Sequence, residues 1–175
     1  DEAGAIMLYS LEWKPREQSF YYIFNATLRA MDRNKLKPWF LYLRLLIHAL
    51  SKLPVVQQTV YRGVKADLHE LYPQNSTCVW WGFSSCTSSM KVLQVDAFLG
   101  QRGTRTMFHI DSSSAKSISP HSLYPEEEEV LLPAARLFQV VSSLDAGDGL
   151  HMIHLKEIQP EHPLIEDPVS DAAVR

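Results

Sequence analysis

The sequence predicts an α+β fold in which a helical lobe precedes a mixed, largely antiparallel β core. Apolar residues recur at helical spacing through the first third of the chain, and short β-rich segments follow Pro54. These segments do not alternate with long helices, as they would in a doubly wound parallel sheet. With 175 residues the chain is long enough for one domain and too short for two domains of ordinary size.

Two helices are expected before Pro54. The first lies within residues 15–32, where apolar positions recur every three or four residues. Those positions are Phe20, Ile23, Phe24, Thr27, Leu28 and Met31. The second helix lies within residues 34–54, with Pro38 in its first turn and Pro54 beyond its end.

Six strand-like segments are expected after these helices. They are residues 59–64, 78–85, 104–110, 129–133, 136–144 and 150–158. Residues 145–149, Asp-Ala-Gly-Asp-Gly, predict a hairpin turn between the last two strands. One further helix is expected at about 90–98, and the Pro-rich, acidic segment from Pro160 is expected to fray.

The composition is typical of a globular protein that binds neither nucleic acid nor a membrane surface. Hydrophobic residues make up 46% of the chain, the formal net charge is −3, and no basic block is present to attract a polyanion. The longest apolar stretch contains Arg44 and His48 and is too short to span a bilayer, so no membrane segment is predicted. The oligomeric state stays open, with a monomer favoured.

Two cysteines, Cys78 and Cys86, are too far apart to pair if both lie on one extended strand. Two free thiols and the lack of a recognisable signal peptide favour a cytoplasmic location. A secreted location also stays open, because a chain that begins at Asp1 is compatible with processing.

Common catalytic and metal-binding motifs are absent from the sequence. It contains no Gly-rich phosphate loop, no G-x-S-x-G, no H-E-x-x-H and no C-x-x-C. His109, His121, His151 and His154 are scattered, and strand packing accounts for the three that lie in strand-like segments. No metal site is therefore predicted.

Arg62 lies within an apolar strand-like segment, V-Y-R-G-V. An arginine in such a strand costs desolvation energy unless an anion meets it, and its planar guanidinium is suited to a phosphate or a carboxylate. Gly63, which follows, lets another group approach the backbone closely. The alternative is a structural ion pair between Arg62 and a carboxylate.

A hydroxyl-rich segment, G-F-S-S-C-T-S-S, ends the second strand-like segment. Alternation along a strand puts Ser85 and Thr87 on one face and Ser84 and Cys86 on the other. Hydroxyls on a sheet face are suited to hold a carboxylate or a ribose. The alternative is an N-cap for a helix that begins near Met90.

Four consecutive glutamates precede the fourth apolar strand. If Glu129 begins this strand, the two-residue period puts Glu127 on the same face and Glu126 and Glu128 on the other. Two carboxylates that point the same way are suited to stabilise a cation at a glycosidic carbon and to handle a nucleophile. The alternative is a solvated acidic loop, which is the usual fate of a charge run.

Taken together and in this order, the three segments resemble the arginine, serine and glutamate strands of mono-ADP-ribosyltransferases. The form Y-P-E-E-E-E-V-L-L-P is most similar to the arginine-specific branch, with its vertebrate ecto-enzymes and binary-toxin catalytic domains. The ordered match spans residues 59–158. The resemblance implies one catalytic domain over residues 1–175. It would have a helical part over about 1–55, a two-sheet β core over about 56–160 and a tail over 161–175.

The activity that this resemblance implies is transfer of ADP-ribose from NAD to arginine side chains of a protein, with release of nicotinamide. NAD would be a co-substrate, and no metal would be required. The implied partner is a target protein that carries an accessible arginine.

The resemblance also implies a role for each matching residue. Arg62 would hold the NAD phosphates, and Ser85 would scaffold the site and hydrogen-bond the catalytic glutamate. Thr87 would take the third position of the serine motif. Glu129 would be the catalytic glutamate, bound to the ribose 2'-hydroxyl, and Glu127 would orient or deprotonate the acceptor guanidinium.

Three further positions complete the implied site. Gly63 would lie beside the NAD phosphates, and Phe98 would pack on the nicotinamide ring. Tyr124, five residues before Glu129, would sit in the loop that recognises the target protein.

The sequence departs from the family pattern at two points. Cys86 stands where the family has Ser or Thr, and it is expected to be tolerated because strand alternation points it away from the site. Glu126 and Glu128 form a second E-x-E pair. The pair of Glu127 and Glu129 is preferred, because the catalytic glutamate of the family directly precedes the apolar strand.

Three other functions stay open. The chain could be a hydrolase that cleaves NAD without a protein acceptor, a catalytically silent module that binds NAD or a peptide, or a plain interaction domain. Silent members of the family typically lack the glutamate, so the set of Arg62, Ser85 and Glu129 argues against the second function. The ordered match of three motifs argues against the third.

Overall fold

The computed structural model describes residues 2–11, 13–56, 58–96, 98–123 and 127–165. The helices are α1 (Glu2–Ser10), α2 (Phe20–Arg29), α3 (Phe40–Ser51) and α4 (Met90–Leu93), and the 3-10 turns are η1 (Arg16–Gln18), η2 (Arg33–Trp39), η3 (His69–Leu71) and η4 (Ser119–His121). The strands are β1 (Gln58–Val64), β2 (Thr77–Trp80), β3 (Ser84–Thr87), β4 (Arg105–Ser112), β5 (Lys116–Ser117), β6 (Glu129–Leu132), β7 (Arg136–Asp145) and β8 (Leu150–Ile158).

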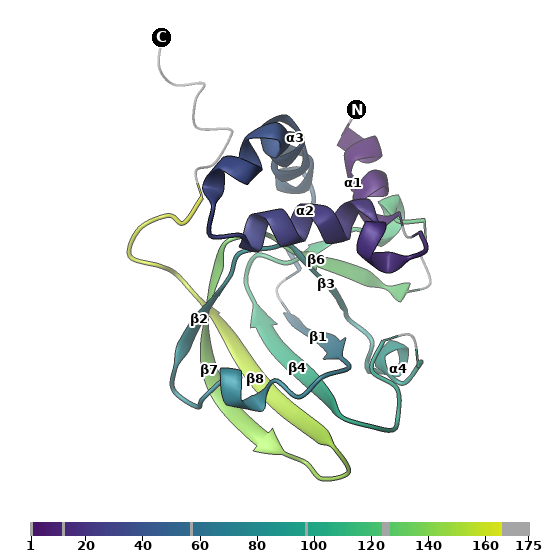
Figure 1. Cartoon of the computed structure of the whole chain (residues 1–175), viewed down its shortest axis with the longest axis vertical. Coiled ribbons are helices and arrows are strands. Elements are labelled where there is room, and N and C mark those ends of the chain that lie inside the picture. The colour runs from purple at the N-terminus through teal and green to yellow at the C-terminus, as the bar shows by residue number, and fades with distance from the viewer. Residues whose placement is uncertain (1, 12, 57, 97, 124–126, 166–175) are drawn as a thin grey trace.

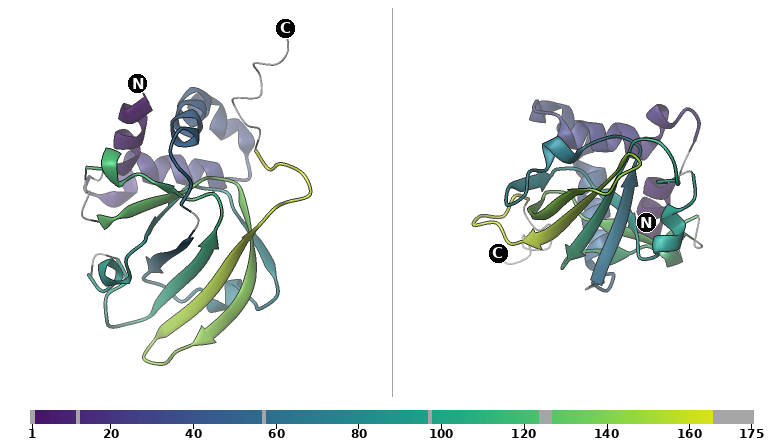
Figure 2. Two further views of the ribbon diagram at one scale, coloured as in Figure 1. Left: turned by 180° about the vertical axis from the view of Figure 1, so that it is seen from behind. Right: turned by 90° about the horizontal axis from the view of Figure 1, so that it is seen from below.

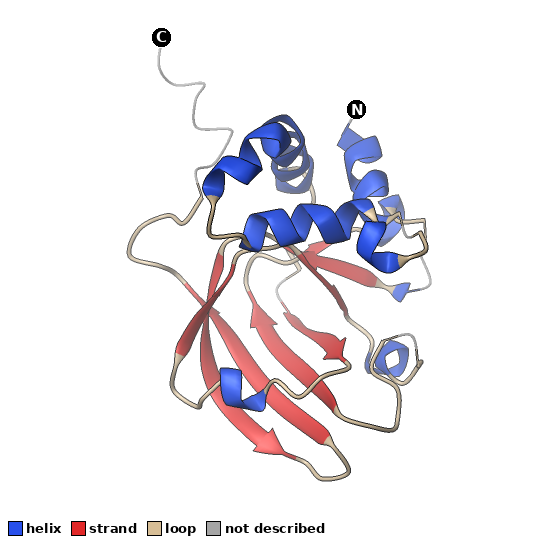
Figure 3. Cartoon of the chain, viewed as in Figure 1, coloured by secondary structure: helices blue, strands red, loops and turns tan. Residues whose placement is uncertain are grey.

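The three N-terminal helices form a lobe at one end of the β-structure (Figure 1). They lie over β3 and β6, while the longer strands β4, β7 and β8 extend away from them (Figure 3). The predicted order of a helical lobe followed by a β core is therefore confirmed.

Hydrogen bonds join the strands into one mixed sheet in the order β2-β7-β8-β4-β1-β3-β6-β5. Only β4 and β8 pair in parallel among the described strands, so the sheet is largely antiparallel, as predicted. The contact between β1 and β3 consists of one register pair, Tyr61 with Thr87. This weak junction divides the sheet into two parts that diverge in space (Figure 2), so the expected two-sheet core is corrected to one sheet that is nearly interrupted between β1 and β3.

Two hydrophobic cores meet at β6, which is buried along its whole length. Leu131 belongs to the core under the helices, together with residues such as Phe24 and Leu46. Its neighbours Val130 and Leu132 belong to the core between the two parts of the sheet. Because successive residues of a strand point to opposite faces, one short apolar strand can close both cores.

The single strand predicted over residues 78–85 is wrong. Its first half is β2, which pairs with β7 at the edge of the sheet, and its second half belongs to β3, which pairs with β6. The chain between them passes close to α2, since a Cβ atom on Gly82 would lie 2.9 Å from Asn25 Oδ1. Packing against a distant helix thus overrides the local strand propensity.

The helices also differ from their predicted bounds. The helix expected within 15–32 ends at Arg29, and Met31 lies beyond it, 99% exposed. The first turn expected within 34–54 is the 3-10 segment η2, and the α-helix proper begins at Phe40. The helix expected at about 90–98 is the single turn α4. The helix α1 and the short strand β5 were not predicted.

One smaller prediction is confirmed. Cys78 and Cys86 are both free thiols. Among the described helices, none is both long enough and apolar enough to cross a membrane.

Replacing Phe24 by alanine tests the core beneath the helices. Phe24 is fully buried and contacts the rings of Trp39, Tyr42 and Phe83. We expect Phe24→Ala to lower the free energy of unfolding by about 3–5 kcal/mol, because apolar burial is lost and a cavity remains. Urea denaturation followed by circular dichroism measures this change. Met31→Ala is the control, with an expected change within about 0.5 kcal/mol, and equal effects of the two variants would contradict the packing described.

Candidate active site

A cavity of about 370 Å³ opens between the helical lobe and strands β1, β3 and β6. Its lining includes the predicted site residues Arg62, Gly63, Ser85, Thr87, Phe98, Glu127 and Glu129. Tyr124 lies outside the described residues, as does Glu126. The tertiary structure thus brings residues from three sequence-distant motifs into one concave surface.

Arg62 stands at the junction of the two parts of the sheet. It follows Tyr61, the only residue of β1 that is a register partner of a β3 residue. Its Nη1 atom donates a hydrogen bond to the carbonyl oxygen of Ser85, with a distance of 2.7 Å. This bond ties the arginine strand to the serine strand and orients the guanidinium at the wall of the cavity.

Gly63 is required by packing against the protein itself. A Cβ atom at this position would lie 2.7 Å from Leu99 Cβ and 3.1 Å from the Leu99 backbone nitrogen. Real Cβ atoms do not approach this closely, so any larger residue would displace the segment that carries Phe98 and Leu99. The group that approaches the backbone at Gly63 is therefore part of the chain.

The serine strand has the alternation that the sequence predicts. Cys86 packs in the core between the two parts of the sheet, where it is 5% exposed. Ser85, the register partner of Leu131, faces the helical lobe and lines the cavity together with Tyr9 of α1. Cys86 is buried but also belongs to the lining of the cavity, so the prediction that it points away from the site is not confirmed.

Thr87 connects the serine strand to the glutamate segment. Its Oγ1 atom donates to the carbonyl oxygen of Glu127 at 3.0 Å and accepts the backbone N–H of Ser89 at 3.1 Å. Ser89 is the N-cap of α4, but its own side chain makes no capping bond. The hydroxyl of Thr87 thus holds the backbone of Glu127 in place.

Glu129 is the first residue of β6 and the register partner of Thr87. Its side chain is 9% exposed, and Ser122 Oγ donates a hydrogen bond to Oε2 at 3.2 Å. A carboxylate held by a strand and by a neighbouring hydroxyl keeps a defined position.

Glu128 separates the two carboxylates of the cavity. Its backbone has φ +48°, in the left-handed region, and its exposed side chain accepts a hydrogen bond from Ser88 Oγ at 2.9 Å. Glu127 precedes β6 and is not part of a strand. Glu127 and Glu129 therefore share the cavity because the chain turns at Glu128, and the predicted reason, strand alternation through Glu127, is wrong.

The helical lobe supplies site residues that the sequence analysis did not single out. Tyr9 and Asn25 line the cavity, and Asn25 Nδ2 donates to the Tyr9 hydroxyl at 2.8 Å. Burial raises the pKa of Tyr9 well above its usual value, so its hydroxyl stays protonated. Asn25 Oδ1 is buried and has no hydrogen-bond partner within the described ranges. Asn25 is a polar residue among the buried positions of α2, and this pattern is the sequence signal that could have revealed the contribution of the helical lobe to the cavity.

The sequence of the chain matches a known enzyme family over most of its length. Residues 1–162 match the sequence profile of the family described as NAD:arginine ADP-ribosyltransferase. The chain belongs to this family. Its resemblance to ADP-ribosyltransferases and its α+β fold are thus established, while the role of each residue in the cavity stays a prediction.

The curated relatives carry consistent names. A putative NAD(+)–arginine ADP-ribosyltransferase Mav of Mycobacterium avium (strain 104) is 37% identical over 112 residues, which is 62% of this chain and 13% of that protein. The GPI-linked NAD(P)(+)–arginine ADP-ribosyltransferase 1 of Mus musculus is 33% identical over 101 residues, or 58% of this chain and 29% of that protein. The chain therefore spans well under half of the length of these relatives.

Solved structures share the fold. The ADP-ribosyltransferase Vis of Vibrio splendidus superposes with a TM-score of 0.70 and 23% identity, over 93% of this chain and 76% of that one. HopU1 of Pseudomonas syringae gives a TM-score of 0.71 and 23% identity, over 90% of this chain and 76% of that one.

The reactivity of the two cysteines tests the environment of the serine strand. Burial raises the pKa of the Cys86 thiol to about 12, and burial raises that of the half-buried Cys78 to about 11. Only the thiolate reacts with iodoacetamide, so near neutral pH we expect both residues to react more slowly than a free peptide thiol, and Cys86 more slowly than Cys78. Mass spectrometry of tryptic peptides measures both rates, and fast alkylation of Cys86 in the folded protein would contradict its placement in the core.

Proposed function

We propose that this chain, residues 1–175, is a catalytic domain that transfers ADP-ribose from NAD to an arginine side chain of a target protein and releases nicotinamide. The observation that carries the proposal is the meeting of Arg62, Glu127 and Glu129 around one cavity. The names of the curated relatives, which specify NAD and arginine, support it.

The charges of the cavity fit a dinucleotide. Its cationic lining residues are Arg16, Arg29, Arg62 and Lys65. The planar guanidinium of Arg62 has several N–H donors, of which one is used by the Ser85 carbonyl. The others suit the oxygens of a diphosphate, which are well matched by a guanidinium fork.

Glu129 is suited to the bond that breaks. In the proposed reaction the bond between ribose C1' and nicotinamide breaks heterolytically, and nicotinamide leaves with the electron pair. The cation that develops on the ribose needs a nearby anion, and a carboxylate already held in position supplies it without reorganisation. Ser122 and the pairing of β6 with β3 hold Glu129 in this way.

Glu127 is suited to the acceptor. An arginine guanidinium is protonated at neutral pH and is a poor nucleophile. In the proposed reaction Glu127 takes a proton from the guanidinium as its nitrogen bonds to C1'. Thr87 positions Glu127 through a hydrogen bond to the Glu127 backbone carbonyl.

Three glutamate variants test these roles. With radiolabelled NAD, and with agmatine as a soluble guanidine acceptor, we expect Glu129→Gln to lower both transfer and NAD cleavage by at least about 100-fold. Glu127→Gln is expected to lose transfer to agmatine and to keep part of the NAD hydrolysis, because water needs no deprotonation of a guanidinium.

Glu128→Gln is the matched control, because this exposed glutamate is adjacent in sequence and directed to Ser88. It is expected to keep both activities at the wild-type level. Full transfer by the Glu127 and Glu129 variants would refute the assigned roles. Hydrolysis by the wild-type protein without any transfer would identify an NAD glycohydrolase instead, and NAD binding without either reaction would identify a silent module.

A further inference from the structure

A cluster of metal-ligating side chains lies on the face of β4 and β8 that points away from the core between the two parts of the sheet. His109 of β4 and His154 of β8 are register partners, and Asp111 follows two residues later on β4. The His154 Nε2 atom lies 2.8 Å from Asp111 Oδ2, and the His109 Nε2 atom lies 3.6 Å from Asp111 Oδ1. Two imidazoles and one carboxylate thus converge from two paired strands.

The spacing of these atoms matches a zinc site. Bonds of 2.0–2.2 Å in a tetrahedral arrangement place neighbouring ligand atoms about 3.3 Å apart. The two distances in the cluster lie on either side of this value, and all three ligand atoms fall within 4.8 Å of one another. The rings of His109 and His154 are stacked with centroids 4.5 Å apart and planes inclined by 29°, so metal binding requires the two imidazoles to turn about their side-chain torsions until both nitrogens face one ion.

The surroundings of Asp111 resemble the outer shell of a metal site. Thr59 Oγ1 donates to Asp111 Oδ1 at 3.0 Å from the neighbouring strand β1, and such bonds orient a ligating carboxylate. Lys156, the register partner of Asp111, is exposed, so its ammonium can stay in solvent.

We propose that His109, Asp111 and His154 bind one Zn²⁺ ion, with the fourth coordination position open to water. Two imidazoles and a carboxylate favour Zn²⁺ over Mg²⁺ or Ca²⁺, which take oxygen ligands. The side chains of His109, His154 and Asp111 are 40%, 28% and 44% exposed, so an ion can enter from solvent.

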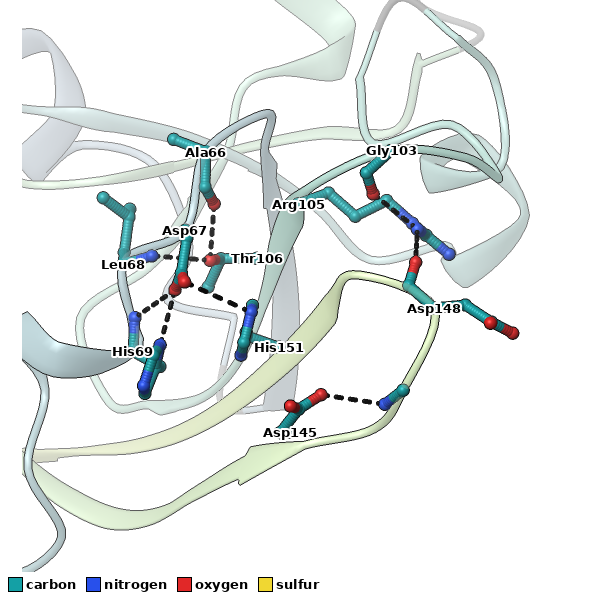
Figure 4. A network of polar contacts seen from close by, with 11 residues as sticks. Ala66, Asp67, Leu68, His69, Gly103, Arg105, Thr106, Asp145, Asp148 and His151 are labelled. Atoms are coloured by element: carbon teal, nitrogen blue, oxygen red, sulfur yellow. Dashed lines mark hydrogen bonds and ion pairs between the residues drawn. The ribbon is translucent and has the colours of Figure 1, made fainter.

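The second His–Asp–His cluster of the described chain has a different explanation. Asp67 Oδ1 accepts both the backbone N–H and the Nδ1 of His69, which makes a local turn beside η3 (Figure 4). His151 Nε2 lies 3.4 Å from Asp67 Oδ2, but the two rings stack with planes only 8° apart. The Asp67 carboxylate is thus already engaged by two groups of His69 within this turn, so Asp67 serves as a matched control.

The proposed site lies next to the wall of the cavity. The ring of His109 packs against Tyr61, a cavity-lining residue, with ring centroids 5.6 Å apart. The ligands themselves do not line the cavity. Zinc binding therefore does not rest on the proposed function, and a protein that fails to act on NAD can still bind the ion.

Isothermal titration calorimetry tests the proposal on the protein after removal of metal by a chelator. We expect the wild-type protein to bind ZnCl₂ with a stoichiometry of one, and Asp111→Asn to lose saturable binding. Thr59→Val, which keeps the shape but removes the hydroxyl, is expected to weaken binding by about 10–100-fold. Asp67→Asn is expected to bind like the wild type.

Two further measurements keep the test decisive. Circular dichroism checks that each variant is folded, and His154→Gln replaces Asp111→Asn as the test if that variant unfolds. Co²⁺ used in place of Zn²⁺ is expected to show the intense visible absorption of a four-coordinate site, and this absorption should be lost in His154→Gln. The proposal is overturned if the wild type shows no saturable binding, if Asp111→Asn and His154→Gln bind normally, or if Asp67→Asn alone abolishes binding.

Discussion

The hydrogen bond from Arg62 to the carbonyl of Ser85 is the interaction on which the site depends. It crosses the junction between β1 and β3, where the ladder of the sheet is reduced to a single register pair. A guanidinium in an apolar strand needs such a partner, because its burial without one costs several kcal/mol. The bond also spans the point at which the two parts of the sheet diverge, and the cavity opens there. The arginine strand β1, the serine strand β3 and the glutamate strand β6 thus share one surface. They do so because the sheet continues from β1 to β3 through a single register pair.

The glutamate run shows how a short stretch of like charges can enter a core without mutual burial. Glu129 lies in β6 and is held by Ser122, while Glu128 turns outward in a left-handed conformation and is held by Ser88. Thr87 holds the backbone of Glu127 from the adjacent strand. Each of the three glutamates that the structure describes therefore has a separate local support, and water screens the exposed Glu128. Repulsion among the carboxylates is reduced by a backbone turn that the pattern of residues did not reveal.

Much of the architecture was predictable because it follows from local patterns. The helical spacing around Phe24 located α2, and the apolar runs located β1, β4, β6, β7 and β8. The prediction failed where contacts distant in sequence dominate. Gly82 passes so close to Asn25 of α2 that the expected strand over 78–85 becomes two strands in different parts of the sheet. The left-handed turn at Glu128 escaped prediction for the same reason. The hydrogen bond that supports it comes from Ser88, which directly follows β3 and is 40 residues away in the sequence.

The sequence by itself determined the chemical inventory and its order: one guanidinium, a hydroxyl-rich strand and paired carboxylates, in a chain whose helices come first. These properties are local, because the chemistry of a side chain and the spacing of apolar residues can be read from a short stretch of sequence. Tertiary structure alone decided which of them meet. It placed Tyr9 and Asn25 of the helical lobe on the cavity wall. It also put His109 beside His154, which are 45 residues apart in the sequence, through the parallel register of β4 and β8. Strand pairing depends on the free energy of the whole fold, so the partner of a strand cannot be read from a short stretch of sequence.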